Sequence, residues 1–229
     1  MDELTVSTKK TSNAVLIAGI AIVFVLPIIL TEIIATSNLD YIDRIFYSRF
    51  IYWLDSAVIV LYAYFAEHQK PLLWRAKQRD IGFFIVSVIV LYFLSLGCSV
   101  VSLIPKFLGW KENDDVIKKL ADIFRGRTAL IIFISLTAGV TEEFLFRGYI
   151  LTRLSLVFKN KYLPIIVSAI LFSALHYRYH SLREYIVTFS IGLLYGAYYQ
   201  KYRNIVALMA VHFLVDFISL ELATHFTLK

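Results

Sequence analysis

The chain contains very little cysteine, since Cys98 is the one thiol among 229 residues. A single thiol excludes an intrachain disulfide and a zinc site built from cysteines. Cys98 lies in an apolar run, where a thiol usually serves as a small packing residue. The sequence also lacks a basic stripe interleaved with stacking aromatic residues, the pattern of nucleic-acid binding. We therefore expect no nucleic-acid partner.

Apolar residues, by contrast, are abundant. They make up 59% of the chain, and the mean hydropathy is +0.71. A soluble domain is about 45–50% apolar by a similar count, so the composition indicates an integral membrane protein in contact with the lipid bilayer. The length fits a single membrane domain, residues 1–229. The net charge of +6 is consistent with Lys and Arg in short loops beside anionic lipid.

Seven segments are apolar over lengths that suggest membrane helices, which need about 20 residues to cross a bilayer. They cover residues 14–34, 46–66, 81–104, 128–152, 162–177, 184–200 and 203–222. The first is longer than the apolar core of a signal peptide, so we expect it to remain as a membrane helix. The expected fold class is all-α, a polytopic transmembrane bundle of seven or eight spans.

Two further features concern helix packing. The fifth and sixth segments are short, but Gly192 and Gly196 have the small-xxx-small spacing that lets helices approach closely, and Ser168 and Ala169 are also small. Residues 111–127 carry mixed charges and apolar side chains at helical spacing, which predicts an amphipathic helix at the membrane surface.

Charged and polar side chains lie inside three of the apolar segments. Such groups are costly at membrane depth unless they face one another or water, so each is a candidate for function. The three groups are Glu142, Glu143 and Arg147; Phe172 and His176; and His212 and Asp216. Together they suggest a polar reaction chamber inside a helical bundle.

The first group divides into a paired and an unpaired acid. Glu143 and Arg147 are four residues apart with the acid first, the favourable order for an ion pair on a helix. Glu142 points about 100° away, because an α-helix turns every 3.6 residues. Glu142 therefore has no local counter-ion. A buried carboxylate without a counter-ion takes up a proton more readily, which is what a general base must do. Alternatively, both acids simply tie helices together.

The other two groups contain histidines. Phe172 lies one turn before His176 on the same helix face. His212 and Asp216 are also one turn apart, so the carboxylate can reach the imidazole, as an acid does when it orients a catalytic histidine. Either histidine, taken alone, could instead be a structural residue of the bundle.

The three motifs, in this order on membrane helices, resemble the CPBP family of intramembrane proteases. This family comprises CAAX-processing and bacteriocin-processing proteins, also called Abi proteins. The resemblance covers about residues 125–222, the expected catalytic core, and leaves residues 1–110 as accessory membrane helices. It implies a multi-helix bundle with an active site in a conical cavity.

The resemblance also implies roles for individual residues. By motif position, Glu142 and His176 would activate water, while His212 and Asp216 would stabilise the oxyanion. Asp216 departs from the asparagine of the CAAX-prenyl endoproteases, and an ionised aspartate cannot donate a hydrogen bond. Asp216 is therefore either protonated, or it is ionised and orients His212, which then donates the hydrogen bond to the oxyanion. The second alternative is favoured. Glu143, Arg147 and Phe172 would support the site.

Metal dependence is left open by the sequence. Glu142, His176 and His212 could bind Zn²⁺ with an open fourth position. The H-E-x-x-H pattern is absent, however, and the paired acids resemble glutamate-based hydrolysis, so a reaction without metal or other cofactor is favoured.

The leading hypothesis is an intramembrane endopeptidase of a membrane-associated peptide or protein, in a bacterial cytoplasmic membrane. One alternative is a non-catalytic immunity or scaffold protein of the same fold that binds a membrane partner. Another is a proton-coupled transporter, although such proteins tend to show internal repeats. In this sequence the motifs gather in one half.

Overall fold

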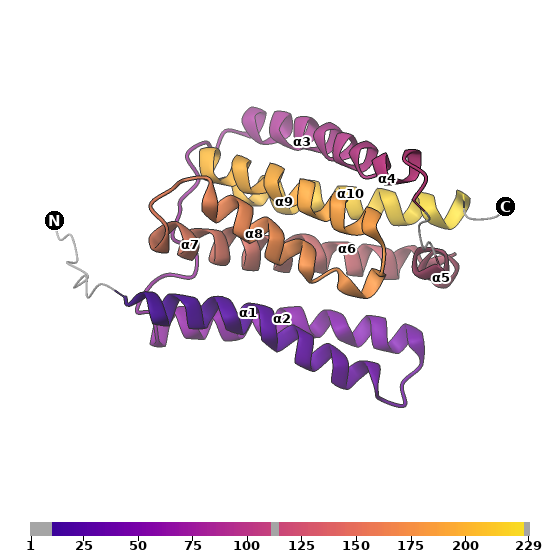
Figure 1. Cartoon of the computed structure of the whole chain (residues 1–229), viewed down its shortest axis with the longest axis horizontal. Helices are drawn as coiled ribbons and strands as arrows, with labels where there is room; N and C mark the ends of the chain where they lie inside the picture. The colour runs from indigo at the N-terminus through magenta and orange to yellow at the C-terminus, as the bar shows by residue number, and fades with distance from the viewer. Residues whose placement is uncertain (1–10, 111–114, 227–229) are drawn as a thin grey trace.

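The computed structural model describes residues 11–110 and 115–226, and every regular element within these ranges is a helix (Figure 1). The all-α class is confirmed. Five helices are long and apolar enough to cross a membrane: Asn13–Ala35, Tyr41–Phe65, Ile81–Phe107, Thr128–Val157 and Ile205–His225. They correspond to five of the seven predicted spans.

The other two predicted spans are helical but are not among these five. Residues 162–177 correspond to α8 (Leu163–Ala174), followed by a 3-10 turn, η2 (Tyr177–Tyr179). The 12 residues of α8 extend about 18 Å at 1.5 Å per residue, less than a hydrocarbon core of roughly 30 Å. Residues 184–200 lie within α9 (Leu182–Tyr202), which carries charged residues near both ends.

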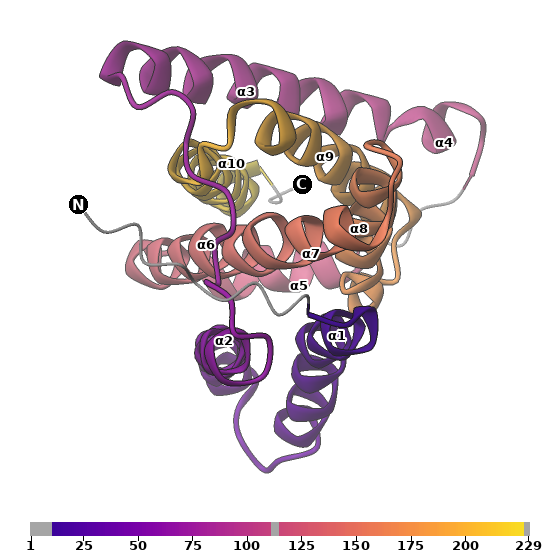
Figure 2. The same cartoon turned by 90° about the vertical axis from the view of Figure 1, so that its left-hand side faces the viewer.

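The helices form three layers (Figures 1 and 2). One outer layer holds α1 (Asn13–Ala35) and α2 (Tyr41–Phe65), which pack against each other. The opposite outer layer is α3 (Ile81–Val101), followed by the single turn α4 (Ile104–Phe107). Between them lie α8, α9 and α10 (Ile205–Phe226), together with a long central helix. Many large apolar side chains of the outer layers are exposed, as a lipid-facing surface requires.

The central helix consists of α6 (Thr128–Glu142), η1 (Glu143–Leu151) and α7 (Thr152–Val157) in one continuous run. Within its most apolar window 56% of the residues are buried, against 17–28% for the other four candidate spans. This helix is therefore the interior element of the bundle, and polar groups on it are shielded from lipid.

The middle of this helix is wider than the sequence predicts. Residues Glu143–Leu151 form a π-helix, whereas the spacing of the motif residues predicts a regular α-helix throughout. Short π-helical stretches are rare and often occur at functional sites. Here the π-helix begins at the second acid of the Glu142–Glu143 pair.

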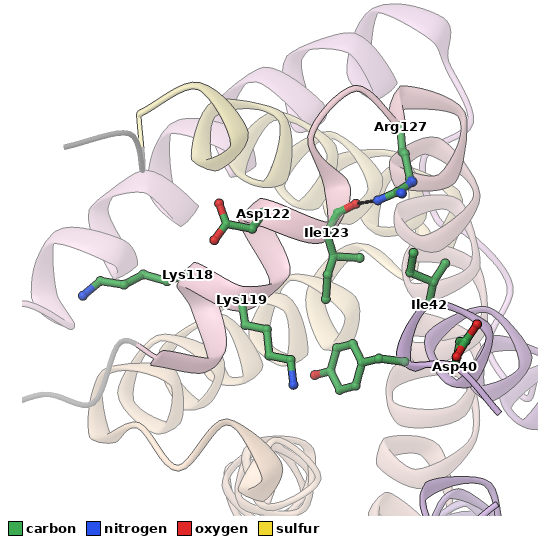
Figure 3. A pocket seen from close by; sticks show the side chains of 8 residues that line it. Asp40, Ile42, Lys118, Lys119, Asp122, Ile123 and Arg127 are labelled. Atoms are coloured by element: carbon green, nitrogen blue, oxygen red, sulfur yellow. Dashed lines mark hydrogen bonds between the residues drawn. The ribbon is translucent and has the colours of Figure 1, made fainter. Parts of the chain in front are cut away.

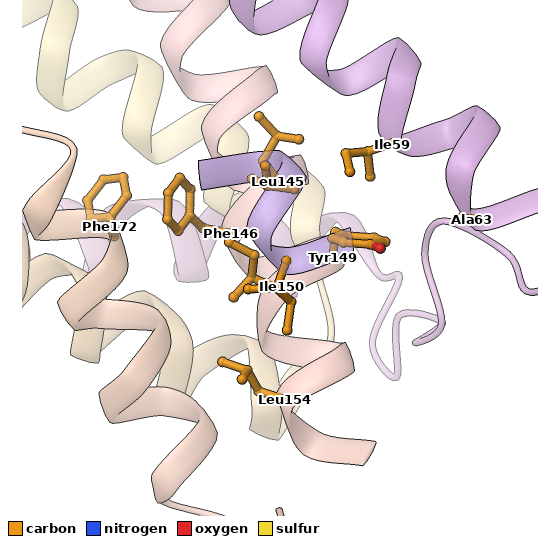
Figure 4. Packing of buried hydrophobic residues seen from close by; sticks show 10 residues of the cluster. Ile59, Ala63, Leu145, Phe146, Tyr149, Ile150, Leu154 and Phe172 are labelled. Carbon is orange, nitrogen blue, oxygen red and sulfur yellow. The ribbon is translucent and has the colours of Figure 1, made fainter. Parts of the chain in front are cut away.

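The π-helix is held by an apolar cluster contributed by four neighbouring segments (Figure 4). The buried members are Ile20, Val23, Ile59, Ala63, Leu145, Phe146, Tyr149, Ile150, Leu154 and Phe172. Because they come from α1, α2, η1, α7 and α8, the cluster fixes the acid-bearing helix relative to the helix that leads to His176.

A buried ion pair ties the same helix to the α2–α3 loop. The Arg153 Nη2 atom lies 2.7 Å from Glu67 Oε2, and the Tyr149 hydroxyl donates a hydrogen bond of 2.6 Å to Glu67 Oε1. All three side chains are buried. Removing one partner of such a pair typically costs about 3–5 kcal/mol, so this contact stabilises the end of the central helix.

A short amphipathic helix, α5 (Asp115–Phe124), occupies most of the predicted 111–127 segment, and residues 111–114 lie outside the described ranges. Ala121 and Phe124 are buried, and α5 packs against α6 and α10. The prediction of a helix here is confirmed for the described residues.

Small residues allow close helix contacts, as the sequence predicts. A methyl group added at Gly192 would lie 2.8 Å from the Ala169 Cβ atom, so α8 and α9 touch at this point. Gly139 on α6 makes an equally close contact, to backbone atoms, that no sequence motif indicated. A methyl group there would lie 2.8 Å from the Met209 carbonyl oxygen and 2.9 Å from the Phe213 amide nitrogen of α10.

We therefore expect Gly139→Ala to destabilise the protein by about 1–3 kcal/mol, the usual effect of overpacking. Backbone atoms cannot move aside as a flexible side chain can, so α6 and α10 must separate. The measurement is the thermal unfolding midpoint in detergent. Gly97→Ala is the matched control, because a methyl group there meets nothing within 4 Å. Equal midpoints for the two variants would contradict the close contact.

Candidate active site

The two acids of the central helix have different surroundings. The Glu143 carboxylate is fully buried, and its Oε1 atom lies 2.8 Å from Arg147 Nη1, so the predicted ion pair is present. The Arg147 guanidinium also lies 4.4 Å from the centre of the Phe172 ring and 5.3 Å from that of Tyr195. Aromatic faces attract a cation, so Phe172 helps to hold Arg147 in place.

His176 follows the end of α8 and is held by the preceding turn. Its Nδ1 atom lies 3.0 Å from the Phe172 carbonyl oxygen, and the two rings contact edge to face with centroids 5.1 Å apart. A carbonyl oxygen can only accept, so Nδ1–H donates. In the neutral ring, the Nε2 atom then carries a lone pair that can accept a proton.

His212 on α10 is surrounded by three carboxylates. Its Nδ1 atom lies 2.7 Å from Glu143 Oε1. Its Nε2 atom lies 3.5 Å from Asp216 Oδ2 and 3.9 Å from Glu142 Oε2. The short contact to Glu143 therefore orients the ring, and Nε2 is left facing the other two acids.

This arrangement changes one part of the sequence interpretation. Asp216 was expected to orient His212, and Glu143 to serve only Arg147. In the structure, Glu143 contacts both Arg147 and His212, while Asp216 lies on the opposite side of the ring at a longer distance. The Asp216 side chain is 33% exposed, against 9% for His212, so Asp216 lies toward the edge of the site.

Glu142 and His176 line the same small cavity. Its volume is about 60 Å³, and its walls are Arg49, Tyr52, Glu142, Phe146, Phe172, Leu175, His176 and Tyr179. This space can hold a water molecule, which takes up about 30 Å³ in the liquid. The two residues expected to activate water are thus brought together.

A wider groove adjoins this cavity. It measures about 470 Å³ and lies between α1, α2 and the α8–α9 connection. The two spaces share four lining residues: Arg49, Tyr52, Leu175 and Tyr179. The groove therefore adjoins the cavity that Glu142 and His176 line.

Arg49, Tyr52 and Tyr179 received no role in the sequence analysis. Arg49 could have been found by the rule that identified the acids, because it is a charge within the apolar run of α2. Tyr52 and Tyr179 gave no such signal, since tyrosine is common in this chain.

Other hollows lie away from this chemistry. A pocket of about 720 Å³ lies between the start of α2 and α5 (Figure 3). It is lined by Asp40, Tyr41, Ile42, Lys118, Lys119, Asp122, Ile123 and Arg127. None of the predicted site residues is among them.

Acids and histidines are the usual ligands of a catalytic zinc ion. Among residues 11–110 and 115–226, no three His, Cys, Asp or Glu side chains are arranged to hold a metal ion. Glu142, His176 and His212, the set expected for a zinc-dependent enzyme, do not form such a group in the described structure.

Comparisons with known proteins place the chain in a family. A family model described as type II CAAX prenyl endopeptidase Rce1-like matches residues 124–218, which contain all seven predicted site residues. The chain belongs to this family. The Rce1-like proteins are part of the CPBP family, so the predicted membership is confirmed. With five apolar helices, this Rce1-like chain is a multi-pass membrane protein of a CAAX-protease type.

A relative from Bacillus subtilis (strain 168), described as the uncharacterized protein YpbD, is 30% identical over 146 residues. The match covers 63% of this Rce1-like chain and 69% of the relative. No solved structure matches the chain.

Proposed function

We propose that the protein is an intramembrane endopeptidase that hydrolyses a peptide bond of a membrane-associated peptide or protein. The observation that carries this proposal is the cavity shared by Glu142 and His176, next to a groove that can hold a peptide. The family match supports the same reaction class.

The reaction begins with a water molecule in the small cavity. Glu142 takes a proton from the water, whose oxygen attacks the carbonyl carbon of the peptide. His176 accepts a hydrogen bond from the same water through Nε2 and so holds it in line. When the carbon–nitrogen bond breaks, Glu142 returns the proton to the leaving amine.

His212 meets the negative charge that builds on the carbonyl oxygen. The Nδ1–H bond to Glu143 fixes the ring, and protonated Nε2 then donates toward the oxyanion. Asp216 lies on the Nε2 side of the ring, 3.5 Å away. Arg147 and Phe172 keep Glu143 in place. In this proposal Glu143 does not contact the substrate but orients the His212 ring.

The membrane placement is also part of the proposal. α8 with η2 and α9 lie alongside the five candidate spans, so we expect seven helices in the bilayer, with the polar chamber among the inner ones (Figure 1). Residues 125–222 would form the catalytic core. The accessory helices of 1–110 supply one wall of the site through Arg49 and Tyr52. The bacterial relative supports the bacterial cytoplasmic membrane as the location.

We expect the chemistry to proceed without metal. Protein dialysed against a strong chelator, with trace metal measured, should keep its turnover, because Glu142 itself supplies the base. The control is the same protein dialysed without chelator. Loss of activity that returns with one equivalent of Zn²⁺ would contradict this prediction and assign Glu142, His176 and His212 as ligands.

The proposed function is tested by comparing the membrane and secreted peptides of cells that carry wild type or Glu142→Ala. Peptides that depend on Glu142 should be present with the wild type and missing with the variant, at equal membrane levels of the two proteins. Identical peptide sets would contradict the proposal and favour a non-catalytic membrane partner.

A further inference from the structure

The groove beside the catalytic cavity is positively charged. Its lining includes Arg44, Arg49, Arg178 and His180, and none of the lining residues is an aspartate or glutamate. Cations at membrane depth are unfavourable without a partner. The partner of each arginine therefore indicates what the groove can bind.

Two of the three arginines already have hydrogen-bond or ion-pair partners within the chain. Arg44 donates to the carbonyl oxygens of Leu39, Ala35 and Ser37 at 2.7–2.8 Å, and so closes the turn between α1 and α2. Arg178 lies 3.3 Å from the carboxylate of Glu32. These two side chains have structural partners within the chain.

Arg49 has no comparable partner. Its hydrogen bonds are two contacts of 3.4 Å to the hydroxyl of the adjacent Ser48, and its guanidinium lies 5.2 Å from the centre of the Tyr52 ring. Within the described ranges, none of the ion pairs includes Arg49. Glu142 lines the same small cavity but does not reach ion-pair distance of it. Arg49 also belongs to both the groove and the catalytic cavity.

We propose that Arg49 binds a carboxylate of the substrate and that the groove therefore selects peptides with a negative charge close to the scissile bond. This inference rests on the proposed function for the identity of the occupant. Arginine is suited to this task, because its planar group forms two parallel hydrogen bonds to a carboxylate. The carboxylate can come from an Asp or Glu side chain or from the end of the peptide.

A substrate carboxylate is favoured because it pairs with a half-buried charge that otherwise has no partner. The guanidinium is half-buried beside an apolar core and keeps most of its five donors free. A neutral peptide would cover the charge and leave it unpaired, whereas a carboxylate would neutralise it. Charged hydrogen bonds of this kind contribute about 10- to 100-fold in affinity.

Binding is measured with the cleavage-deficient Glu142→Gln protein in detergent micelles, so the readout does not depend on turnover. The probes are four versions of one short fluorescent peptide, acylated at its N-terminus. Each peptide has either Asp or Asn at its centre and either a free or an amidated C-terminus. The peptide with Asn and an amidated C-terminus has no carboxylate and is the neutral reference. A carboxylate should tighten binding about 10-fold or more over the fully neutral peptide, and comparison of the Asp and C-terminal versions identifies its source.

Adding Arg49→Gln to this protein should abolish the preference for the carboxylate. The carboxylate peptides should lose affinity, and the neutral peptide should bind at least as tightly as before, because it no longer covers an unpaired charge. Arg49→Lys should keep part of the preference, because the charge remains but the paired geometry is lost. Arg178→Gln is the matched control, since that cation already has Glu32. Elution as a single species and unchanged unfolding midpoints establish that the variants fold.

Equal binding of all four probes to the parent protein would overturn the inference, as would a preference that survives Arg49→Gln. Either outcome leaves the proposed function standing, because that proposal is judged by Glu142-dependent peptides in cells.

Discussion

Glu142→Gln is expected to lower peptide hydrolysis by about 100- to 10,000-fold while leaving the amount of folded protein near normal. Glutamine keeps the size of the side chain but cannot accept the proton of water. The fold should tolerate the change, because the Glu142 carboxylate makes no short ion pair in the described structure; its distance to His212 Nε2 is 3.9 Å. Turnover per folded molecule is the quantity to measure.

The neighbouring acid provides the matched control. Glu143→Gln removes the carboxylate that contacts both Arg147 and His212, so it should reduce the yield and stability of folded protein. Loss of one partner from a buried ion pair typically costs about 3–5 kcal/mol. Two adjacent glutamates should thus give opposite results. Near wild-type turnover of Glu142→Gln would show that the base has been assigned incorrectly.

His212→Ala should reduce turnover by about 100- to 1,000-fold, the usual effect of losing one donor to an oxyanion. Substrate affinity should change little, because the charge on the carbonyl oxygen develops only in the transition state. Steady-state kinetics of the purified protein separate the two quantities. A rise in KM at unchanged kcat would place His212 in substrate binding instead.

Substitutions of Asp216 refine the same prediction. Asp216→Asn should keep substantial activity, because an amide can itself donate to the oxyanion, whereas Asp216→Leu can neither donate nor hold His212. Since Glu143 makes the shorter contact to the ring, we expect even Asp216→Leu to be less harmful than His212→Ala. Wild-type activity of Asp216→Leu would show that Asp216 has no part in catalysis.

The features that the sequence predicted correctly are those determined by composition or by short spacing. Apolar runs predicted an all-helical membrane protein, and a separation of four residues predicted the Glu143–Arg147 ion pair. The contact of Phe172 with His176 follows from the same periodicity. Gly192 predicted a close helix contact because its lack of a side chain is itself the cause.

The features that were missed depend on tertiary packing. Glu143 and His212 are 69 residues apart, and nothing in either local pattern indicates that they meet. The π-helix is another example, because its apolar and charged residues fit an α-helix equally well. Arg49 is brought to the catalytic cavity by the packing of α2 against the central helix, which one sequence does not reveal.

The central claim is that water held by Glu142 and His176 attacks the peptide directly. It is tested by a single turnover of the purified wild-type protein in water labelled with heavy oxygen, followed by mass spectrometry of both product and enzyme. The account predicts label in the new C-terminal carboxylate of the product and none in the side chain of Glu142. Label in Glu142 would show that this carboxylate attacks the peptide itself and would contradict the account.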